Sequence, residues 1–203
     1  PIIGVPGTID NDIPGSEDTI GFDTAVNTGI EAIDRIRDTA SSHDRLFLVE
    51  VMGRNAGFIA VQVAIGGGAE TIVVPEYKQS IGQICQTIDR GIKRGKKSSI
   101  IVVAEGPRPN LAVRLGDTLR KRGYGPRVCI LGHIQRGGIP SGHDRFLAST
   151  LGAAAVAYLL AGRSDAMVGV SRNQVKLVPL SKIYQCVKSL PLEIINLAKI
   201  LAT

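Results

Sequence analysis

The fold of this chain is decided by residues 84–104, which read ICQTIDRGIKRGKKSSIIVVA. The isoleucines at 84, 88 and 92 recur at the spacing of one face of a helix. The apolar run 99–104 that follows has the length and composition of a strand covered on both faces. Because a helix leading into such a strand is part of a βαβ unit, this stretch predicts an α/β protein.

The same alternation extends along the chain. Helical spacing joins Val26, Ile30, Ile33 and Arg37, and a longer helix is indicated by apolar residues at 147, 151, 154, 155, 158 and 159. Short apolar runs that read as strands lie at 2–5, 46–51, 71–74, 99–104, 127–131 and 166–170. Right-handed crossovers then predict a three-layer α/β fold, with a mainly parallel sheet and helices on both faces. Strand 2–5 should be interior to such a sheet, so we expect a further segment upstream of Pro1.

The composition is that of a globular protein, with 44% hydrophobic and 21% charged residues among 203. We expect no membrane span, because no apolar run approaches about 20 residues, and the first residues do not resemble a secretion signal. Cys85, Cys129 and Cys186 are scattered and odd in number. This pattern is typical of reduced thiols in a cytoplasmic protein.

The net charge of +6 indicates an anionic partner. Nucleic acid is one alternative, but the chain has no Trp, only 4 Phe and 4 Tyr, and no motif that stacks bases. Much of the basic excess lies at predicted helix ends, in residues 93–97 and 120–122. A phosphorylated small molecule is the better prediction.

Polar residues follow four of the predicted strands. The loops are 6–12 (PGTIDND), 50–57 (EVMGRNAG), 105–108 (EGPR) and 132–138 (GHIQRGG). In open α/β sheets ligands bind beyond the carboxyl ends of the strands, so we expect these loops to meet at one edge. Carboxylates suit sugar hydroxyls, Arg and His suit phosphate, and glycines allow close backbone approach.

Each loop also has a purely structural interpretation. Asp10 and Asp12 are suited to shaping a turn, His133 to a satisfied place in the core, and Arg54 to an ion pair with Glu50. Residues 132–138 are also compatible with an ordinary loop. The predicted convergence of all four loops on one edge favours the functional interpretation.

Two arginines stand apart from these loops. Arg45 and Arg127 begin their strands, about 17 Å from the predicted site, so they either cap the opposite rim or reach the site of a neighbouring subunit.

No GxxxxGK[ST] or GxGxxG motif is present, and Gly66-Gly67-Gly68 lacks the spacing of either.

Together these motifs resemble the bacterial-type, ATP-dependent 6-phosphofructokinase family. Residues 6–12 are similar to its catalytic signature, and 50–54 and 132–138 are similar to two further hallmark stretches, in the same order and at similar spacing. Residues 21–22, 32–39 and 42–43 add to the resemblance, which covers nearly the whole chain.

The resemblance implies transfer of the ATP γ-phosphoryl group to the 1-hydroxyl of fructose 6-phosphate. Asp10 would be the general base, Thr8 and Asp12 would arrange the transfer site, and Arg54 would stabilise the transferring group. The remaining substrate contacts implied are Ile9, Met52, Gly53, Glu105, His133, Ile134, Gln135 and Arg136, with Arg45 and Arg127 donated across a subunit interface of a homotetramer.

The residue before Thr8 separates donor classes in this family: glycine accompanies ATP, and lysine accompanies pyrophosphate in many members. Gly7 therefore favours ATP. The resemblance places the ATP-phosphate loop and a magnesium-binding Asp in a Gly-Gly-Asp-Gly segment upstream. We therefore assign no metal ligand to this chain, and the resemblance does not imply that the chain is active by itself. Alternatives are a non-catalytic regulatory paralogue that binds fructose phosphates, and a pyrophosphate-dependent enzyme.

The resemblance also implies a domain division and an effector site. Residues 1–20 and 134–184 would belong to the nucleotide-side domain, and 21–133 with 185–203 to the sugar-phosphate domain. An effector, a nucleotide or phosphoenolpyruvate, would contact Arg37, Arg94, Lys96 and Lys97, although a basic helix end explains these residues equally well.

Overall fold

The computed structural model describes residues 1–40, 45–96 and 98–201. Lys97, Ser42 and His43 lie outside the described residues. The chain forms two compact units. Unit 1 consists of Pro1–Ala25 and Gly138–Ser189, and unit 2 of Val26–Gly137 and Leu190–Thr203.

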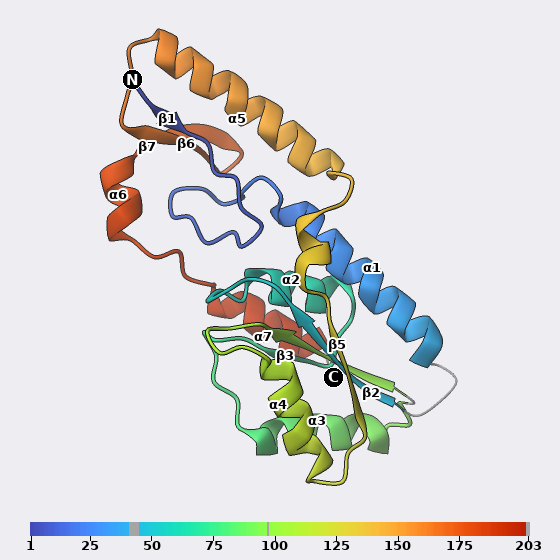
Figure 1. The fold of residues 1–203 in the computed structure, drawn as a ribbon. Helices are drawn as coiled ribbons and strands as arrows, with labels where there is room; N and C mark the ends of the chain where they lie inside the picture. The colour runs from blue at the N-terminus through green and yellow to red at the C-terminus, as the bar shows by residue number, and fades with distance from the viewer. Residues whose placement is uncertain (41–44, 97, 202–203) are drawn as a thin grey trace. The chain divides into compact units, whose positions relative to one another are not determined.

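Unit 2 is built on a four-stranded, wholly parallel sheet (Figure 1). Its strands in spatial order are β3 (Thr71–Val73), β4 (Ser98–Ala104), β2 (Arg45–Val51) and β5 (Pro126–Ile130). Leu48 lies beside Ile101 on one side and beside Val128 on the other. Leu48 and Ile101 are fully buried, as expected for apolar strands covered on both faces.

Helices cover both faces of this sheet. Apolar side chains of α3 and α4 pack on every second residue of β2 and β4, which together form one face of the sheet. Helix α2 contacts β4 on the opposite face. The terminal helix α7 packs on α2 and β3. The helices of unit 2 are α2 (Phe58–Gly66), α3 (Ile81–Lys93), α4 (Leu111–Arg120), the 3₁₀ turn η1 (Gly132–Arg136) and α7 (Leu192–Leu201).

Helix α3 shows how the first part of residues 84–104 folds. A capping box fixes its start, since the Gln83 N–H donates to Ser80 Oγ and the Ser80 N–H donates to Gln83 Oε1. Ile84 and Ile88 are buried against the sheet, as the periodicity predicts, whereas Ile92 is 58% exposed at the helix end. The helix ends at Lys93, so the basic run 93–96 is indeed a helix terminus, where cations complement the helix dipole.

Unit 1 holds a second sheet of three strands, in the order β1-β6-β7. Apolar residues of α5, notably Leu147 and Leu151, pack against Val168 of β6. The elements of unit 1 are β1 (Ile3–Gly4), α5 (Gly142–Leu160), β6 (Ala166–Ser171), β7 (Gln174–Pro179) and α6 (Leu180–Gln185). Helix α1 (Phe22–Ala40) begins in unit 1 and ends in unit 2.

The buried carboxylate of Asp144 explains where α1 begins. It accepts hydrogen bonds from the backbone N–H groups of Gly21 and Thr24, both at 2.8 Å, and from the Thr24 hydroxyl. The first N–H groups of a helix have no partner within the helix. Asp144, itself in the first turn of α5, therefore serves as a cap contributed by a distant part of the chain.

The predicted α/β class is confirmed, but two details differ. Strand β7 was not expected; it pairs antiparallel with β6 through a tight turn in which Arg172 and Asn173 both have positive φ. Strand β1 pairs with β6 of this sheet and not with β2, β4 or β5. The strands thus divide between two sheets instead of sharing one.

The described residues agree with two general expectations. All three cysteines are free thiols, in agreement with their scattered positions. Within residues 1–40, 45–96 and 98–201, no helix combines the length and hydropathy that a membrane span requires.

Candidate active site

In unit 1 the loop after β1 carries the predicted catalytic carboxylate. Asp10 is 7% exposed, and its N–H donates to Thr8 Oγ1 at 3.2 Å. The Thr8 carbonyl in turn accepts a hydrogen bond from Thr19 Oγ1 at 2.7 Å. The threonine side chains therefore fix the backbone around Asp10, while Asp12 is exposed at the end of the loop.

Asn11 lies between the two aspartates, and both the nitrogen and the oxygen of its side-chain amide form hydrogen bonds. Its backbone has φ 51, a conformation that asparagine tolerates well. Asn11 Nδ2 donates to the Glu17 carbonyl, and Lys188 Nζ donates to Asn11 Oδ1 at 2.8 Å and to the same carbonyl at 2.7 Å. Lys188 thus ties a distant segment of unit 1 to the loop that carries Asp10.

Burial lowers the pKa of Lys188 to about 8, although the carboxylates of Asp18, Asp12 and Glu17 oppose the shift. Between about pH 8 and the ordinary lysine value of 10.5, the unfolded chain binds more protons at this residue than the folded chain does. We therefore expect the free energy of unfolding of the parent, minus that of Lys188→Met, to rise across this window. Below it the difference should be flat, because both states are protonated.

Urea unfolding at a series of pH values measures this difference. Lys182→Met removes an exposed lysine of α6 in the same unit and serves as the control. A parent-minus-variant difference that stays constant across the window would show that Lys188 is not desolvated by folding.

In unit 2 three of the predicted loops lie at one edge of the sheet. They follow β2, β4 and β5, which run parallel to one another, so their carboxyl ends share that edge. The fourth loop, residues 6–12, follows β1 of the other sheet. The expectation that four loops meet at the edge of a single sheet is therefore wrong, because β1 finds its hydrogen-bond partner in β6 and not in β2, β4 or β5.

The turn after β2 is closely determined by its neighbours. Gly53 has φ 140, and a Cβ there would lie 2.5 Å from the Ala56 carbonyl oxygen, so only glycine fits. The Met52 N–H donates to Gln135 Oε1 at 2.8 Å. The Arg54 N–H donates to Glu105 Oε1 at 2.6 Å, and Arg54 has φ 50 with an exposed side chain. Glu105 and Gln135 thus fix the backbone that presents the Arg54 side chain.

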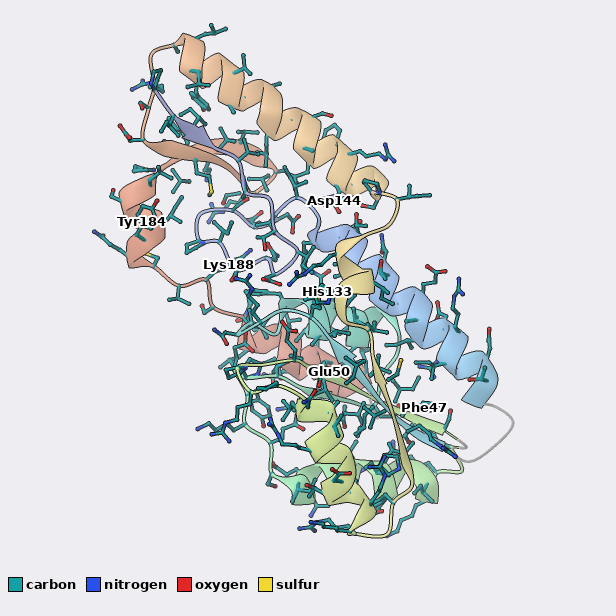
Figure 2. All side chains as sticks on the ribbon, in the orientation of Figure 1. Phe47, Glu50, His133, Asp144, Tyr184 and Lys188 are labelled. Carbon is teal, nitrogen blue, oxygen red and sulfur yellow. The ribbon has the colours of Figure 1, made fainter. Side chains whose placement is uncertain are left out.

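The 3₁₀ turn η1 separates exposed from buried side chains. His133 and Arg136 are exposed, and Ile134 is 61% exposed, so His133 is not the core residue of the alternative interpretation. Gln135 is 1% exposed and engaged with Met52. Figure 2 labels His133 in the side-chain view. This turn therefore presents one imidazole and one guanidinium for a ligand and uses its amide side chain to hold the neighbouring loop.

Glu50 has a structural task that the sequence did not indicate. It is 6% exposed, and its Oε2 accepts a hydrogen bond from the Ala112 N–H at 2.8 Å, in the first turn of α4. A carboxylate near a helix N-terminus is favourable for the helix dipole. The alternative interpretation of an ion pair with Arg54 is thus not needed to account for this buried acid.

Arg45 and Arg127 stand at the other ends of their strands. Arg45 is the first residue of β2 and Arg127 the second of β5, where it pairs with Phe47. The Arg127 side chain is exposed. Both residues therefore lie away from the carboxyl edge of their sheet, as the sequence predicts.

The predicted effector residues already have some partners in unit 2. The Arg37 guanidinium donates to the carbonyls of Gly67 and Gly68, at 2.6 and 3.0 Å. Lys96 Nζ lies 3.5 Å from Glu70 Oε1, and Arg94 is the exposed C-cap residue of α3. Lys97, the fourth of them, lies outside the described residues.

Carboxylates of this chain are possible metal ligands. Among the residues that the structure describes, no three His, Cys, Asp or Glu side chains are grouped so that they could hold a metal ion. Mg²⁺ in phosphoryl-transfer sites is commonly held by one or two carboxylates together with substrate phosphates. Asp10 and Asp12 are donors of this type, so the chain is compatible with a metal carried by a nucleotide.

Comparison with known proteins identifies the relatives of this chain. It is 52% identical over 203 residues to ATP-dependent 6-phosphofructokinase 1 of Thermus thermophilus. This alignment covers all of this chain and 63% of that protein. It is 56% identical over 184 residues to the ATP-dependent 6-phosphofructokinase of Shouchella clausii, 90% of this chain and 57% of that one. The chain thus spans about three-fifths of the length of these curated relatives.

Solved structures agree with the sequence relatives. Phosphofructokinase from Saccharomyces cerevisiae matches with a TM-score of 0.85 and 36% identity, over 91% of this chain and 26% of that one. A pyrophosphate-dependent phosphofructokinase from Marinobacter aquaeolei matches with a TM-score of 0.80 and 27% identity, over 94% of this chain and 54% of that one. The family model described as Phosphofructokinase matches residues 1–159, more than three-quarters of the sequence. This chain therefore belongs to the phosphofructokinase family.

Proposed function

We propose that the full-length protein transfers the γ-phosphoryl group of ATP to the 1-hydroxyl of fructose 6-phosphate, giving fructose 1,6-bisphosphate and ADP. The observation that carries the proposal is the buried carboxylate of Asp10 on a loop fixed by Thr8 and Thr19. Its support is the identity of more than half of the residues with proteins named ATP-dependent 6-phosphofructokinase.

Each loop has a proposed role in this reaction. Asp10 accepts the proton of the attacking hydroxyl, and Thr8 and Asp12 help to arrange the transfer site. Arg54 stabilises the charge on the transferring phosphoryl group. The remaining proposed substrate contacts are those of Ile9, Met52, Gly53 and Glu105 with the sugar, and of His133, Ile134, Gln135 and Arg136 around its 6-phosphate.

The proposed donor is ATP with Mg²⁺, which neutralises phosphate charge when bound. Gly7 supports this choice, because glycine at this position accompanies ATP in the family. A Cβ at Gly7 would have no atom within 4 Å, so packing does not account for the glycine. The fold itself therefore does not demand glycine at this position, which leaves the identity of the residue free to serve the choice of donor.

Coupled assays of the full-length protein with ATP and with pyrophosphate test the proposal. Formation of fructose 1,6-bisphosphate with Mg²⁺–ATP is the expected result. Turnover with pyrophosphate alone would overturn the choice of donor, and fructose 6-phosphate binding without any turnover would overturn the activity.

Removing Arg136 should weaken fructose 6-phosphate binding about 10- to 100-fold, the effect of losing a charge-assisted hydrogen bond. We suggest Arg136→Gln, measured as the KM for fructose 6-phosphate and by direct titration. Its side chain is exposed, so the fold should tolerate the change. Arg145→Gln, an exposed arginine of α5, is the control, and an unchanged affinity in the Arg136 variant would make the η1 turn purely structural.

The protein is proposed to act as a homo-oligomer, a homotetramer by family resemblance, in which Arg45 and Arg127 reach a neighbouring subunit's substrate. Their place at the amino ends of the strands supports this role. Closed symmetry would then give every subunit a complete set of residues.

Subunit hybrids test this sharing. A mixture of Asp10→Ser and Arg127→Gln subunits should regain activity after exchange, because some sites then contain both native residues. Mass spectrometry of the mixed oligomers verifies the exchange. Verified hybrids without recovered activity would show that both residues act within one chain.

Three further expectations remain proposals. Units 1 and 2 correspond to the nucleotide-side and sugar-phosphate domains, with the predicted boundaries within a few residues of the compact units. Arg37, Arg94, Lys96 and Lys97 contact an anionic effector. The protein acts in the cytoplasm, which the free thiols support, and has neither a nucleic-acid nor a membrane partner.

A further inference from the structure

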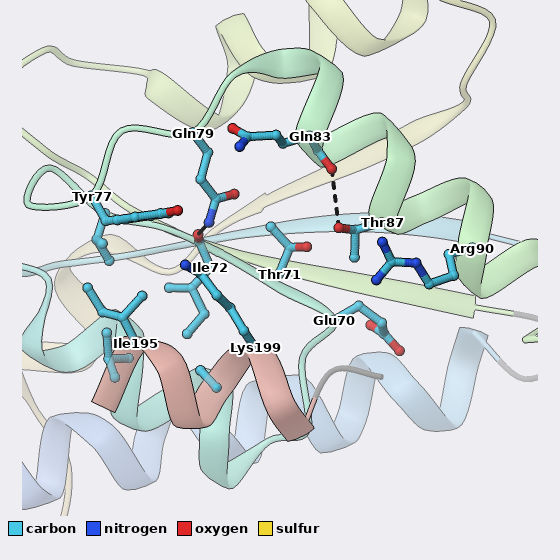
Figure 3. A pocket seen from close by; sticks show the side chains of 13 residues that line it. Glu70, Thr71, Ile72, Tyr77, Gln79, Gln83, Thr87, Arg90, Ile195 and Lys199 are labelled. Carbon is cyan, nitrogen blue, oxygen red and sulfur yellow. Dashed lines mark hydrogen bonds between the residues drawn. The ribbon is translucent and has the colours of Figure 1, made fainter. Parts of the chain in front are cut away.

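Unit 2 contains a pocket between strand β3 and helices α3 and α7 (Figure 3). Its volume is about 210 Å³. Of the described residues that line it, none is assigned above to substrate or effector. Since a protein cavity of about 150 Å³ is sufficient to bind benzene, this pocket has room for a ligand built around a single ring.

The floor of the pocket is apolar and comes from two parts of the chain. Ile72 of β3 is 7% exposed, and Ile195 and Ala198 of α7 are 4% and 8% exposed. Val61 and Val74 complete this surface. A hydroxyl group facing this floor would lose its hydration without gaining a partner, so this side of the pocket favours an apolar ligand body, while Thr71, Gln79 and Thr87 offer polar groups elsewhere on the lining.

Two cationic side chains stand on the rim. Arg90, in the last turn of α3, has no hydrogen bond or ion pair from its side chain to any residue that the structure describes. Figure 3 shows its guanidinium on the side of the pocket where Thr71 and Thr87 lie. The Lys199 ammonium lies 3.8 Å from the centroid of the Tyr77 ring, a favourable cation–π arrangement. Arg90 is therefore the cation available to a ligand.

Among the described residues that line the pocket, Glu70 is the one acidic residue. Its Oε2 accepts the Ile100 N–H at 2.6 Å, and its Oε1 lies 3.5 Å from Lys96 Nζ, which offsets part of its charge. With one carboxylate, Glu70, against the two cations Arg90 and Lys199, the described lining carries a net positive charge.

We propose that this pocket binds a small organic anion with an apolar body, of the class of aromatic monocarboxylates. The carboxylate accepts hydrogen bonds from the Arg90 guanidinium, whose paired donors match the two carboxylate oxygens. The apolar body lies against Ile72 and Ile195. A sugar phosphate has the charge but not the apolar body, and a neutral hydrocarbon has the body but not the charge.

Three probes separate these requirements on the full-length protein: benzoate, toluene and inorganic phosphate. Binding is followed by titration calorimetry and by NMR shifts of the Ile and Ala methyl groups, without fructose 6-phosphate or ATP. Benzoate should bind at least about tenfold more tightly than either other probe, as expected when one charge-assisted contact adds to apolar burial. Because no substrate is present, this result is independent of the proposed function.

Variants identify the site. Arg90→Met keeps the apolar stem and should weaken benzoate about tenfold or more, while Lys93→Met removes an exposed charge from the same helix and should leave binding unchanged. Ala198→Phe should fill the pocket and abolish binding; retained urea unfolding behaviour verifies its fold. Benzoate binding no tighter than that of toluene, binding that Arg90→Met does not alter, or phosphate binding as tight as benzoate would each overturn the proposal.

Discussion

Replacing Asp10 by serine in the full-length protein should lower kcat by about 10²–10⁴-fold, the range that a positioned general base contributes. Serine has room in the loop but cannot take the proton of the attacking hydroxyl at neutral pH. KM for fructose 6-phosphate should change far less, because the lost interaction belongs to the transition state. Steady-state kinetics with saturating Mg²⁺–ATP measure both constants.

The burial of Asp10 calls for a control on folding. Asp10→Asn keeps the shape of the side chain and should be as slow as the serine variant, since the amide is not a base. Asp165→Asn changes an exposed aspartate of unit 1 whose φ of 56 suits asparagine as well, so it should retain parental rates. A kcat within tenfold of the parent in both Asp10 variants, with their folds intact, would refute the assignment.

Replacing Arg54 by glutamine should lower kcat about 10³-fold or more, the effect found when an arginine that stabilises phosphoryl-transfer charge is lost. The hydrogen bond that fixes the loop comes from the Arg54 backbone N–H to Glu105, and glutamine keeps this N–H. Urea unfolding of the variant verifies that the fold is retained.

Arg54→Lys separates charge from geometry. Lysine keeps the positive charge but lacks the planar fork of the guanidinium, so its kcat should lie between those of the parent and the glutamine variant. Arg114→Gln, an exposed arginine of α4, is the control. If the Arg54→Gln variant loses affinity for fructose 6-phosphate but keeps its kcat, the arginine binds substrate in the ground state and does not stabilise the transition state.

The sequence alone determined the class of the fold and the residues that follow the strands. Buried parallel strands must be apolar along their whole length, because both of their faces are covered, and this makes residues 46–51 and 99–104 recognisable. Ser80 and Gln83 mark a helix start by the same local logic. The signature loops could be found because each lies within a few residues of its strand.

Which strands pair was decided only by the tertiary structure. β1 and β2 look alike as apolar runs, yet β1 pairs with β6, some 160 residues along the chain, and β2 with β4 and β5. Local periodicity describes which faces of a strand are covered, but not which partner supplies its hydrogen bonds. The unexpected strand β7 did have a local signal, the alternation of Val175, Lys176 and Leu177 after a two-residue turn.

The support of the candidate site was likewise decided by contacts between distant residues. Lys188 holds Asn11 across 177 positions, and Gln135 holds Met52 across 83. A lone lysine or glutamine carries no spacing that marks its partner, so these roles could not be read from the sequence. The pocket under Arg90 is of the same kind, because its floor exists only where α7, from the end of the chain, packs on β3. Local chemistry fixed which groups this protein offers, and long-range packing fixed what holds each of them in place.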